Sequence, residues 1–341
     1  MKRIGILGAA GLFASAILAG AAQAETVLRI SSWASPKHGI NATVWPTWGK
    51  MVEEATEGRV KTKIEYNLGS PIAQMDLIRD GVADVMWTFH GYNPGRFFLT
   101  QAVEMPGLNA SAEAASVAYW RVYEKHLAGK NIHQGVKVIG LTTHGPGVIH
   151  TRKPLKNISD LKGMKVRVGG GIGGEVGKKL GIVGVRVPAP KVYETVAQGV
   201  AEGVFMPMET KVSFKLKEVA PYSLIMPGGL YYGSFVFAMN PDKFNSLSKK
   251  DQDAIMSVSG EVLSKVAGQM WDKVDASGLE DAKKAGNTIT IADAATKAAF
   301  DKLAAQIEQE WIAKAAKKKV DGAKVLADLR KIARDYDAAK K

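Results

Sequence analysis

Arg167 is the residue of this sequence best suited to bind a charged ligand. It lies in the alternating run 165–168, which predicts a strand, and glycines follow it directly. A guanidinium offers a planar fork of donors that matches a carboxylate, and it does not lose its charge. The spacing leaves two interpretations open. Arg167 either anchors a ligand carboxylate or lies on a strand edge, paired with an acid such as Glu175.

The glycines after Arg167 match a second kind of site. Gly169, Gly171 and Gly174 fit the GxGxxG pattern between a predicted strand and a predicted helix, where backbone N–H groups hold a phosphate. The acidic residue that should follow about 20 positions later, for the ribose hydroxyls, is missing. The pattern therefore favours a close backbone approach beside a ligand, at Gly169 and Gly170. An exported dinucleotide-dependent oxidoreductase stays as an alternative.

The other reactive side chains give no catalytic arrangement. The chain has no cysteine, and none of its six histidines has a metal-binding spacing with a carboxylate. No nucleophile elbow and no P-loop occur. His90 and His144 follow predicted strands, where each is placed either to contact a ligand or to be satisfied in the core. We expect a binding protein rather than an enzyme, with no cofactor and no metal.

Length and composition indicate a globular chain of about two domains. It has 341 residues, 46% hydrophobic and 23% charged, and a formal net charge of +13. A basic balance suits an anionic ligand, a nucleic acid or a membrane surface, and it also arises from a solvated lysine-rich surface. Because the chain has no arginine-rich arm and no alternation of aromatic and basic residues, we expect no nucleic acid partner.

The first 24 residues are typical of a secretory signal peptide. Lys2 and Arg3 precede an apolar run over 4–20, and residues 22–24 fit the small-x-small cleavage pattern. The alternative is an uncleaved membrane anchor, for which the run is barely long enough. We expect cleavage before Glu25 and a periplasmic location.

Further along the chain, short strand-like runs alternate with helical stretches, which indicates an α/β protein with open sheets. The predicted strands lie at 27–30, 60–64, 85–87, 136–139, 165–168 and 234–239. Segments 80–87 and 198–205 resemble each other, each with a glycine that stops a helix before an apolar strand. This similarity, unless it is chance, predicts two lobes built on the same unit. It places residues 89–92 of one lobe opposite residues 205–209 of the other.

A long helix is expected near the C-terminal third. Ser248 and Asp251 predict its start, apolar residues recur every four positions, and Gly286 predicts its end. Such a helix of about 38 residues would be near 57 Å long and could cross both lobes, unless Gly260 or another internal glycine breaks it. A later amphipathic helix carries Phe300, Ile307 and Trp311.

Several of these segments together resemble a known family over nearly the whole mature chain. They are residues 158–168, residues 192–203, and the pair 68–70 and 80–84. The pattern is similar to the solute receptors of tripartite ATP-independent periplasmic (TRAP) transporters, of the C4-dicarboxylate-receptor type. The resemblance implies that the arginine at position 167 holds the ligand carboxylate.

The same resemblance implies a two-lobed, periplasmic-binding-protein-like α/β fold with crossing strands and a long domain-spanning helix. Lobe I would comprise residues 25–146 and about 234–275, and lobe II residues 147–233 and about 276–341. The lobes would close on a small-molecule carboxylate. The receptor, expected to be a monomer, would deliver it to membrane permease subunits driven by an ion gradient.

Three positions depart from the family pattern. Gly147 stands where sialic-acid receptors carry a second arginine, Met206 precedes Pro207 where many members have asparagine, and Trp33 replaces a small polar residue of some relatives. One charge and apolar walls suit a monocarboxylate with an apolar or aromatic body. The alternative is that these side chains belong to the core and that the ligand is a small dicarboxylate or a hydroxy or keto acid.

The predicted binding residues come from both lobes. They are Trp33, His90 and Tyr92 from lobe I, Arg167, Gly169, Gly170, Phe205 and Met206 from lobe II, and His144 near the hinge.

Overall fold

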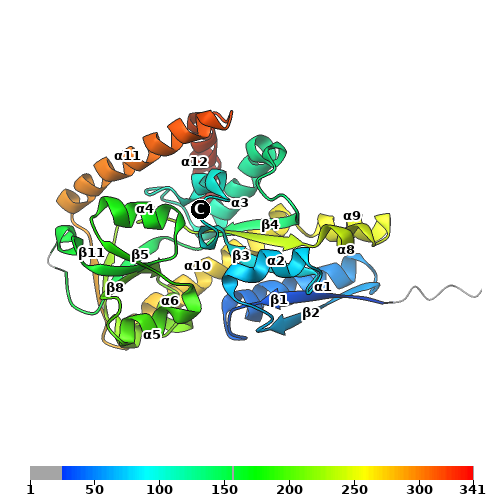
Figure 1. Ribbon diagram of the computed structural model, residues 1–341, viewed down its shortest axis with the longest axis horizontal. Helices are drawn as coiled ribbons and strands as arrows, with labels where there is room; N and C mark the ends of the chain where they lie inside the picture. Colours follow the sequence, from blue (N-terminus) through cyan, green and yellow to red (C-terminus); the bar gives the residue numbers. More distant parts are fainter. Residues whose placement is uncertain (1–24, 156, 341) are drawn as a thin grey trace, which may run out of the picture.

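The computed structural model describes residues 25–155 and 157–340, so the predicted signal peptide lies outside the described residues. Strands form two open sheets that lie beside each other, with helices packed around them (Figure 1). The predicted α/β class with open sheets is confirmed, and all six predicted strands occur.

The first sheet has the strand order β2-β1-β3-β10-β4. Its strands are β1 (Thr26–Ser32), β2 (Val60–Tyr66), β3 (Val85–Phe89), β4 (Lys137–Thr143) and β10 (Ser234–Met239). β1 is parallel to β2 and β3, and β10 runs antiparallel between β3 and β4. Every residue of β3 and β10 is buried, as their almost continuous apolar sequences require at the centre of a covered sheet.

The second sheet has the order β11-β9-β5-β8-β6-β7. Its strands are β5 (Gly147–Thr151), β6 (Lys165–Val168), β7 (Val183–Arg186), β8 (Gly203–Pro207), β9 (Tyr222–Ile225) and β11 (Thr288–Ile291). The chain passes from the first sheet to the second between β4 and β5 and returns between β9 and β10. These are the expected crossing strands.

The repeated segments adopt the same local structure. α2 (Gln74–Arg79) ends before Gly81, and α5 (Val192–Ala197) ends before Gly199. Both glycines have positive φ, 70° and 73°, which glycine adopts without strain. The next strands, β3 and β8, occupy the two different sheets, so the similarity reflects one unit used twice.

The predicted long helix is two helices, α9 (Lys249–Ser257) and α10 (Glu261–Lys284). Gly260 separates them with φ 60°, and a side chain there would collide with the Trp120 ring. The expectation of one 38-residue helix is therefore wrong. α10 still contacts α3 (Ala112–Val122) and β4 on one side and α6 (Thr210–Ser213) on the other, so it links the two sheets.

Further helices complete the layers. They are α1 (Trp45–Ala55), α4 (Gly171–Lys179), α7 (Leu216–Val219), α8 (Pro241–Asn245), α11 (Ala294–Lys317) and α12 (Gly322–Ala338). α11 buries Phe300, Ile307 and Trp311 as the periodicity predicts, and it contacts α4. α12 packs on α3, which contacts β4 of the first sheet. The buried side of α12 includes Val325, Leu326 and Leu329.

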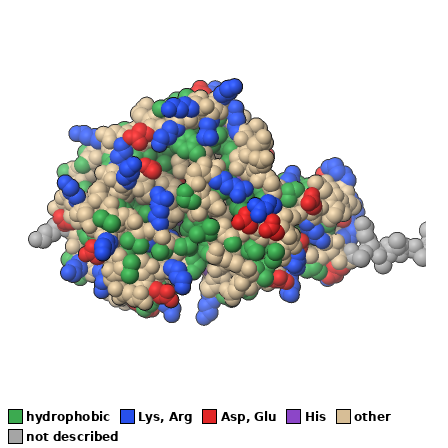
Figure 2. All heavy atoms as spheres, viewed as in Figure 1, with side chains coloured by type: hydrophobic (Ala, Val, Ile, Leu, Met, Phe, Trp, Pro, Cys, Tyr) green, Lys and Arg blue, Asp and Glu red, His purple; other side chains and the backbone are tan. Residues whose placement is uncertain are grey.

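Among the described residues, no helix is long and apolar enough to cross a membrane. On the face drawn in Figure 2, Lys and Arg side chains are interspersed with Asp and Glu, as on an ordinary solvated surface.

Candidate ligand-binding site

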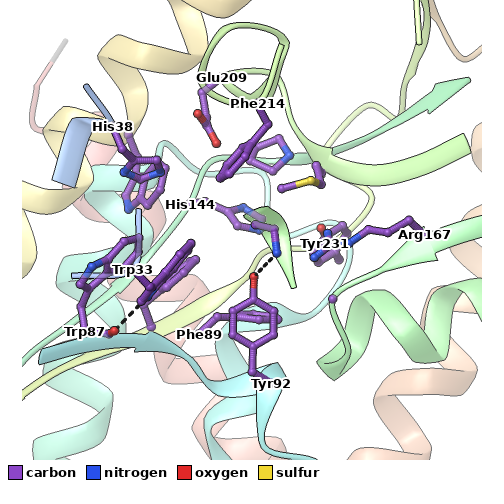
Figure 3. Close-up of a pocket in the computed structure, with 16 residues that line it drawn as sticks. Trp33, His38, Trp87, Phe89, Tyr92, His144, Arg167, Glu209, Phe214 and Tyr231 are labelled. Carbon is purple, nitrogen blue, oxygen red and sulfur yellow. Dashed lines mark hydrogen bonds between the residues drawn. The ribbon is translucent and has the colours of Figure 1, made fainter. Parts of the chain in front are cut away.

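A pocket lies between the two sheets, beyond the carboxyl ends of β1, β3, β6 and β8 (Figure 3). In open α/β sheets this edge is where ligands bind. The pocket is partly enclosed and partly open to solvent. Its lining is mostly aromatic and apolar: Trp33, His38, Trp87, Phe89, Tyr92, His144, Arg167, Gly169, Ala189, Met206, Pro207, Glu209, Phe214, Tyr231, Phe235 and Trp271.

Trp33 and Trp87 form one wall of the pocket. Their rings stack with centroids 4.2 Å apart and an angle of 21° between the planes. Trp33 Nε1 donates to the Trp87 carbonyl at 3.1 Å, and Trp87 Nε1 donates to Ser32 Oγ at 2.9 Å. Because both indole N–H groups have partners within the protein, this wall presents flat apolar surface to the pocket.

Phe235 connects the rings of the pocket. Its centroid lies 5.3 Å from Phe89, 5.7 Å from Trp87 and 5.7 Å from Trp271. Phe235 belongs to β10, the strand that returns from the second sheet, and Trp271 belongs to α10. The two elements that link the sheets therefore also supply the pocket's apolar centre.

Arg167 brings a buried positive charge to one end of the pocket. Its side chain extends from β6 toward Tyr231, and the residue is 2% exposed. Nε and Nη2 donate to the Val187 carbonyl at 2.9 and 2.7 Å. No carboxylate pairs with Arg167 anywhere in the described chain, so the alternative of an ion pair with Glu175 is wrong. An unpaired buried cation is costly, and a bound anion removes that cost.

The side chain of Tyr231 fills the space that a larger residue at position 147 would need. A Cβ at Gly147 would overlap the Tyr231 ring, and the Tyr231 hydroxyl donates to the Phe205 carbonyl at 3.0 Å. Position 147 therefore offers no room for a second arginine, and among the described residues that line the pocket Arg167 is the only Lys or Arg.

Tyr92 contributes a hydroxyl whose hydrogen is free. Tyr92 Oη accepts the Ala189 N–H at 2.9 Å, and within residues 25–155 and 157–340 it donates to no other group. Tyr92 follows β3 in the first sheet, whereas Ala189 follows β7 in the second, so this bond joins the two halves across the pocket. The remaining O–H is available to a ligand.

His144, one of the predicted contacts, presents a hydrogen-bond acceptor to the pocket. Its Nδ1 lies 2.6 Å from the Gly145 carbonyl, which can only accept, so Nδ1 carries the proton. Burial lowers the pKa of His144 to about 4, and the positive charge of Arg167 adds to the effect. The ring is therefore neutral near pH 7, and Nε2 retains its lone pair.

Sequence reasoning missed the carboxyl of Glu209, which is 4% exposed and lines the pocket. Burial raises the pKa of Glu209 to about 8, although the hydrogen bond that Ser213 Oγ donates to Oε2 acts to lower it. The similarity between segments 80–87 and 198–205 did place residues 205–209 at the site. It did not show which of their side chains face inward.

Six of the nine predicted binding residues line the pocket: Trp33, Tyr92, His144, Arg167, Gly169 and Met206. Phe205 points to the other face of β8, where its ring lies close to Gly177 in the core, because neighbours on a strand alternate. Gly170 packs against the Gly91 backbone. His90 lies in a separate polar cluster. These three are corrections to the predicted lining.

That cluster comprises His90, His133, Ser234 and Glu104, and we call it the His90 cluster. His90 Nε2 lies 2.8 Å from His133 Nε2, and His90 Nδ1 lies 3.0 Å from Ser234 Oγ. Ser234 Oγ donates to Glu104 Oε1, and the Ile172 N–H donates to Glu104 Oε2 at 2.8 Å. His90 is thus occupied by protein partners.

Glu104 also explains the glycine pattern. Ile172 lies at the start of α4, and a side chain at Gly171 would collide with the Glu104 carboxyl. The helix N-terminus that would hold a pyrophosphate is therefore capped by the protein's own acid, and the dinucleotide interpretation is wrong.

A lone buried cation in an aromatic pocket between two sheets defines a binding protein for a small anion. The chain matches the family described as "Bacterial extracellular solute-binding protein, family 7" over residues 30–315, and it belongs to that family. It is a solute receptor and not an enzyme, and members of this TRAP receptor class work with membrane permease components.

Solved structures of TRAP solute-binding proteins are similar over almost their whole length. One, from Bordetella bronchiseptica, has (R)- and (S)-mandelate bound. It is 37% identical, with 91% of this chain and 99% of that chain covered and a TM-score of 0.89. Another, from a marine metagenome, is specific for aromatic acid ligands and was co-crystallized with 3-hydroxybenzoate. It is 32% identical, with 92% and 99% covered and a TM-score of 0.86. The resemblance to TRAP receptors and the two-lobed fold are thereby confirmed.

A relative from Comamonas testosteroni is named "Outer membrane transporter protein TsaT". It is 31% identical over 320 residues, which cover 93% of this chain and 94% of that protein.

Proposed function

We propose that this protein is a periplasmic receptor for a monocarboxylate with an aromatic body, which it delivers to a TRAP permease. The observation that carries the proposal is the buried Arg167, which has no ion-pair partner among the described residues and lies at the edge of a pocket lined mostly by aromatic rings. In the proposed complex the ligand carboxylate lies against Arg167, with the Tyr92 O–H as a second donor, and the ring lies along Trp33 and Phe235.

The energetics support an aromatic body. A micromolar dissociation constant requires about 8 kcal/mol. Charge-assisted hydrogen bonds contribute only about 1.5–3 kcal/mol each, so the burial of apolar ligand surface must supply much of the remainder. The mandelate and 3-hydroxybenzoate complexes of the two similar receptors support the same ligand class.

A small dicarboxylate fits the pocket less well. Its second carboxylate would need another cation, and the described lining offers only Arg167 together with neutral histidines and Glu209. Ionised Glu209 would repel it.

Delivery and location follow from the receptor class. We propose that residues 1–24 direct export and are removed, and that the mature protein acts as a monomer. The lobes proposed from the sequence close on the ligand, with the Tyr92–Ala189 bond formed across the gap.

Calorimetry on the mature chain tests the proposal. Benzoate and both mandelate enantiomers are expected to bind with micromolar or lower dissociation constants, and succinate, malate and pyruvate at least 100-fold more weakly. Tighter binding of succinate or malate than of every aromatic acid would overturn it.

A further inference from the structure

The end of the pocket that faces away from Arg167 is not purely apolar. Figure 3 shows His38, Glu209 and Phe214 on this side of the pocket, and Trp271 lines the same pocket. The His38 centroid lies 6.0 Å from Phe214 and 5.5 Å from Trp271. The Glu209 backbone N–H donates to Asp275 Oδ1 at 2.7 Å, and Asp275 lies one helical turn beyond Trp271 on α10. We call these four residues the Glu209 end of the pocket.

Two polar atoms at the Glu209 end have no hydrogen-bond partner among the described residues. Trp271 Nε1 is buried and makes no hydrogen bond to any described residue. Glu209 Oε2 accepts from Ser213 Oγ, but Oε1 has no partner in the same part of the chain. Figure 3 shows the Glu209 carboxyl directed from its loop toward the middle of the drawn side chains. A buried polar atom without a partner, such as Trp271 Nε1, is uncommon, and in a binding pocket it indicates where a ligand supplies the missing partner.

His38 adds a third polar atom with a defined role. The Ile40 N–H donates to His38 Nδ1 at 3.3 Å, and burial lowers the pKa of His38 to about 4, so the ring is neutral. The proton therefore resides on Nε2, which makes this nitrogen a donor. The Glu209 end thus offers N–H donors from Trp271 and His38 together with a carboxyl group that accepts, or donates when protonated.

A hydroxyl group is the small substituent that both donates and accepts. We propose that the Glu209 end recognises a hydroxyl on the ligand ring, so that the receptor selects hydroxylated aromatic monocarboxylates over their unsubstituted counterparts. This inference rests on the proposed function, because it takes the carboxylate to be held at Arg167. An unsubstituted ring would leave the Trp271 N–H and Glu209 Oε1 unpaired in the closed pocket, and that cost produces the discrimination.

Paired titrations test the inference. Calorimetry at pH 7 compares benzoate with 3-hydroxybenzoate and 4-hydroxybenzoate on the native protein, Glu209→Gln, Glu209→Leu and Trp271→Phe. The native protein is expected to bind one of the two hydroxybenzoates about tenfold more tightly than benzoate, the difference that one hydrogen bond makes. Glu209→Gln, whose amide both donates and accepts, retains the preference. Glu209→Leu and Trp271→Phe each reduce the ratio toward one.

The outcomes separate the two proposals. Equal affinity of the native protein for benzoate and both hydroxybenzoates overturns hydroxyl recognition and leaves the aromatic receptor in place. A preference that persists in both Glu209→Leu and Trp271→Phe also overturns it. Failure of every aromatic acid to bind overturns the proposed function and the inference together. A thermal melt of each variant shows that it is folded, and ratios measured within one variant cancel any partial loss of active protein.

Discussion

The ligand pocket and the His90 cluster both bury ionisable groups between the two sheets, but they differ in how many hydrogen-bond partners the protein supplies to those groups. In the cluster, hydrogen bonds join four side chains and end at the N-terminus of α4. In the pocket, Arg167 has only a backbone carbonyl as a hydrogen-bond partner among the described residues, and Trp271 Nε1 has none there. In the cluster, His133 Nδ1 is the one side-chain atom left without a partner among the described residues, whereas in the pocket the buried charge itself has no counter-ion.

The donors and acceptors of the His90 cluster run in one direction. Ser234 Oγ donates to Glu104, so His90 donates from Nδ1 to Ser234, and its Nε2 accepts from His133. This order requires a neutral His90 ring. Burial lowers the pKa of His133 to about 3 and shifts the pKa of His90 well below its usual value. A buried polar group thus indicates a binding role only when its partners have been counted.

The largest expected effect is the loss of ligand affinity caused by a substitution in the pocket. Arg167→Ala is expected to weaken binding of aromatic acids by at least about 100-fold, because it removes charge-assisted bonds of about 1.5–3 kcal/mol each. The fold should persist, since the variant also removes an unpaired buried charge, whose burial is unfavourable. Titration calorimetry and a thermal melt measure the two quantities.

Arg186→Ala is the matched control, because Arg186 is exposed on the neighbouring strand β7 and lies outside the pocket lining. If folded Arg167→Ala binds aromatic acids as tightly as Arg186→Ala does, Arg167 does not hold the ligand.

A substitution in the His90 cluster is expected to lower the stability of the fold instead of the affinity for a ligand. Glu104→Ala leaves the Ser234 hydroxyl and the Ile172 N–H buried without an acceptor, at a cost of about 1–3 kcal/mol for each group. We expect the free energy of unfolding in urea to fall by about 2–4 kcal/mol.

Glu175→Ala is the matched control for Glu104. Glu175 lines a cavity that His90 and Glu104 also line, is half-buried and has no ion-pair partner among the described residues, so its replacement should change stability by less than about 0.5 kcal/mol. If the two variants unfold at the same urea concentration, the His90 cluster does not stabilise the fold.

The sequence was most informative where a residue type has few structural roles at its position. An arginine inside a predicted strand and beside glycines pointed to Arg167, and repeated helix-to-strand segments placed the pocket between two sheets. Alternation within a strand also separates Met206, which faces the pocket, from Phe205, which faces the core. The sequence contains this alternation but not its phase, and the phase depends on what covers each face of β8.

Long-range partners explain the other differences. His90 could not be assigned because its partners His133 and Ser234 are 43 and 144 positions away. Trp271 was absent from the predicted site because it lies on α10, whose register against the pocket depends on contacts with α3 and α6. Helical periodicity marks the buried side of such a helix and does not tell which buried residue meets a cavity.

The third prediction concerns how the affinity of the pocket for its ligand depends on pH. Burial raises the pKa of Glu209 to about 8, so the group is mostly protonated at pH 7 and ionises as the pH rises. An ionised Glu209 repels an anionic ligand. Affinity is therefore expected to fall above about pH 8, by up to about tenfold for each unit of pH.

Other groups near Glu209 define the control. Burial raises the pKa of Asp275 to about 7, whereas His38 and His144, with pKa values of about 4, stay neutral over this range. The Glu209→Gln substitution removes the ionisable carboxyl of Glu209 and leaves those of the neighbouring groups. Calorimetry on this variant between pH 6 and 9 therefore isolates the effect of Glu209. A decline above pH 8 that is identical in the variant would assign the effect to Asp275 or another group.

The smallest effect concerns the second donor at the Arg167 end. Tyr92→Phe removes the free O–H and is expected to weaken every aromatic carboxylate by about three- to tenfold, the contribution of one hydrogen bond. It also leaves the Ala189 N–H without its acceptor, which disfavours the contact between the two halves of the molecule. Both consequences weaken binding in the same direction, and neither depends on a ring hydroxyl. The loss should therefore be equal for benzoate and the hydroxybenzoates, and Tyr193→Phe, in a half-buried position outside the pocket lining, should show none. A loss confined to hydroxylated ligands would mean that Tyr92 contacts the ring substituent, and the carboxylate and hydroxyl ends of the pocket would then have to be exchanged.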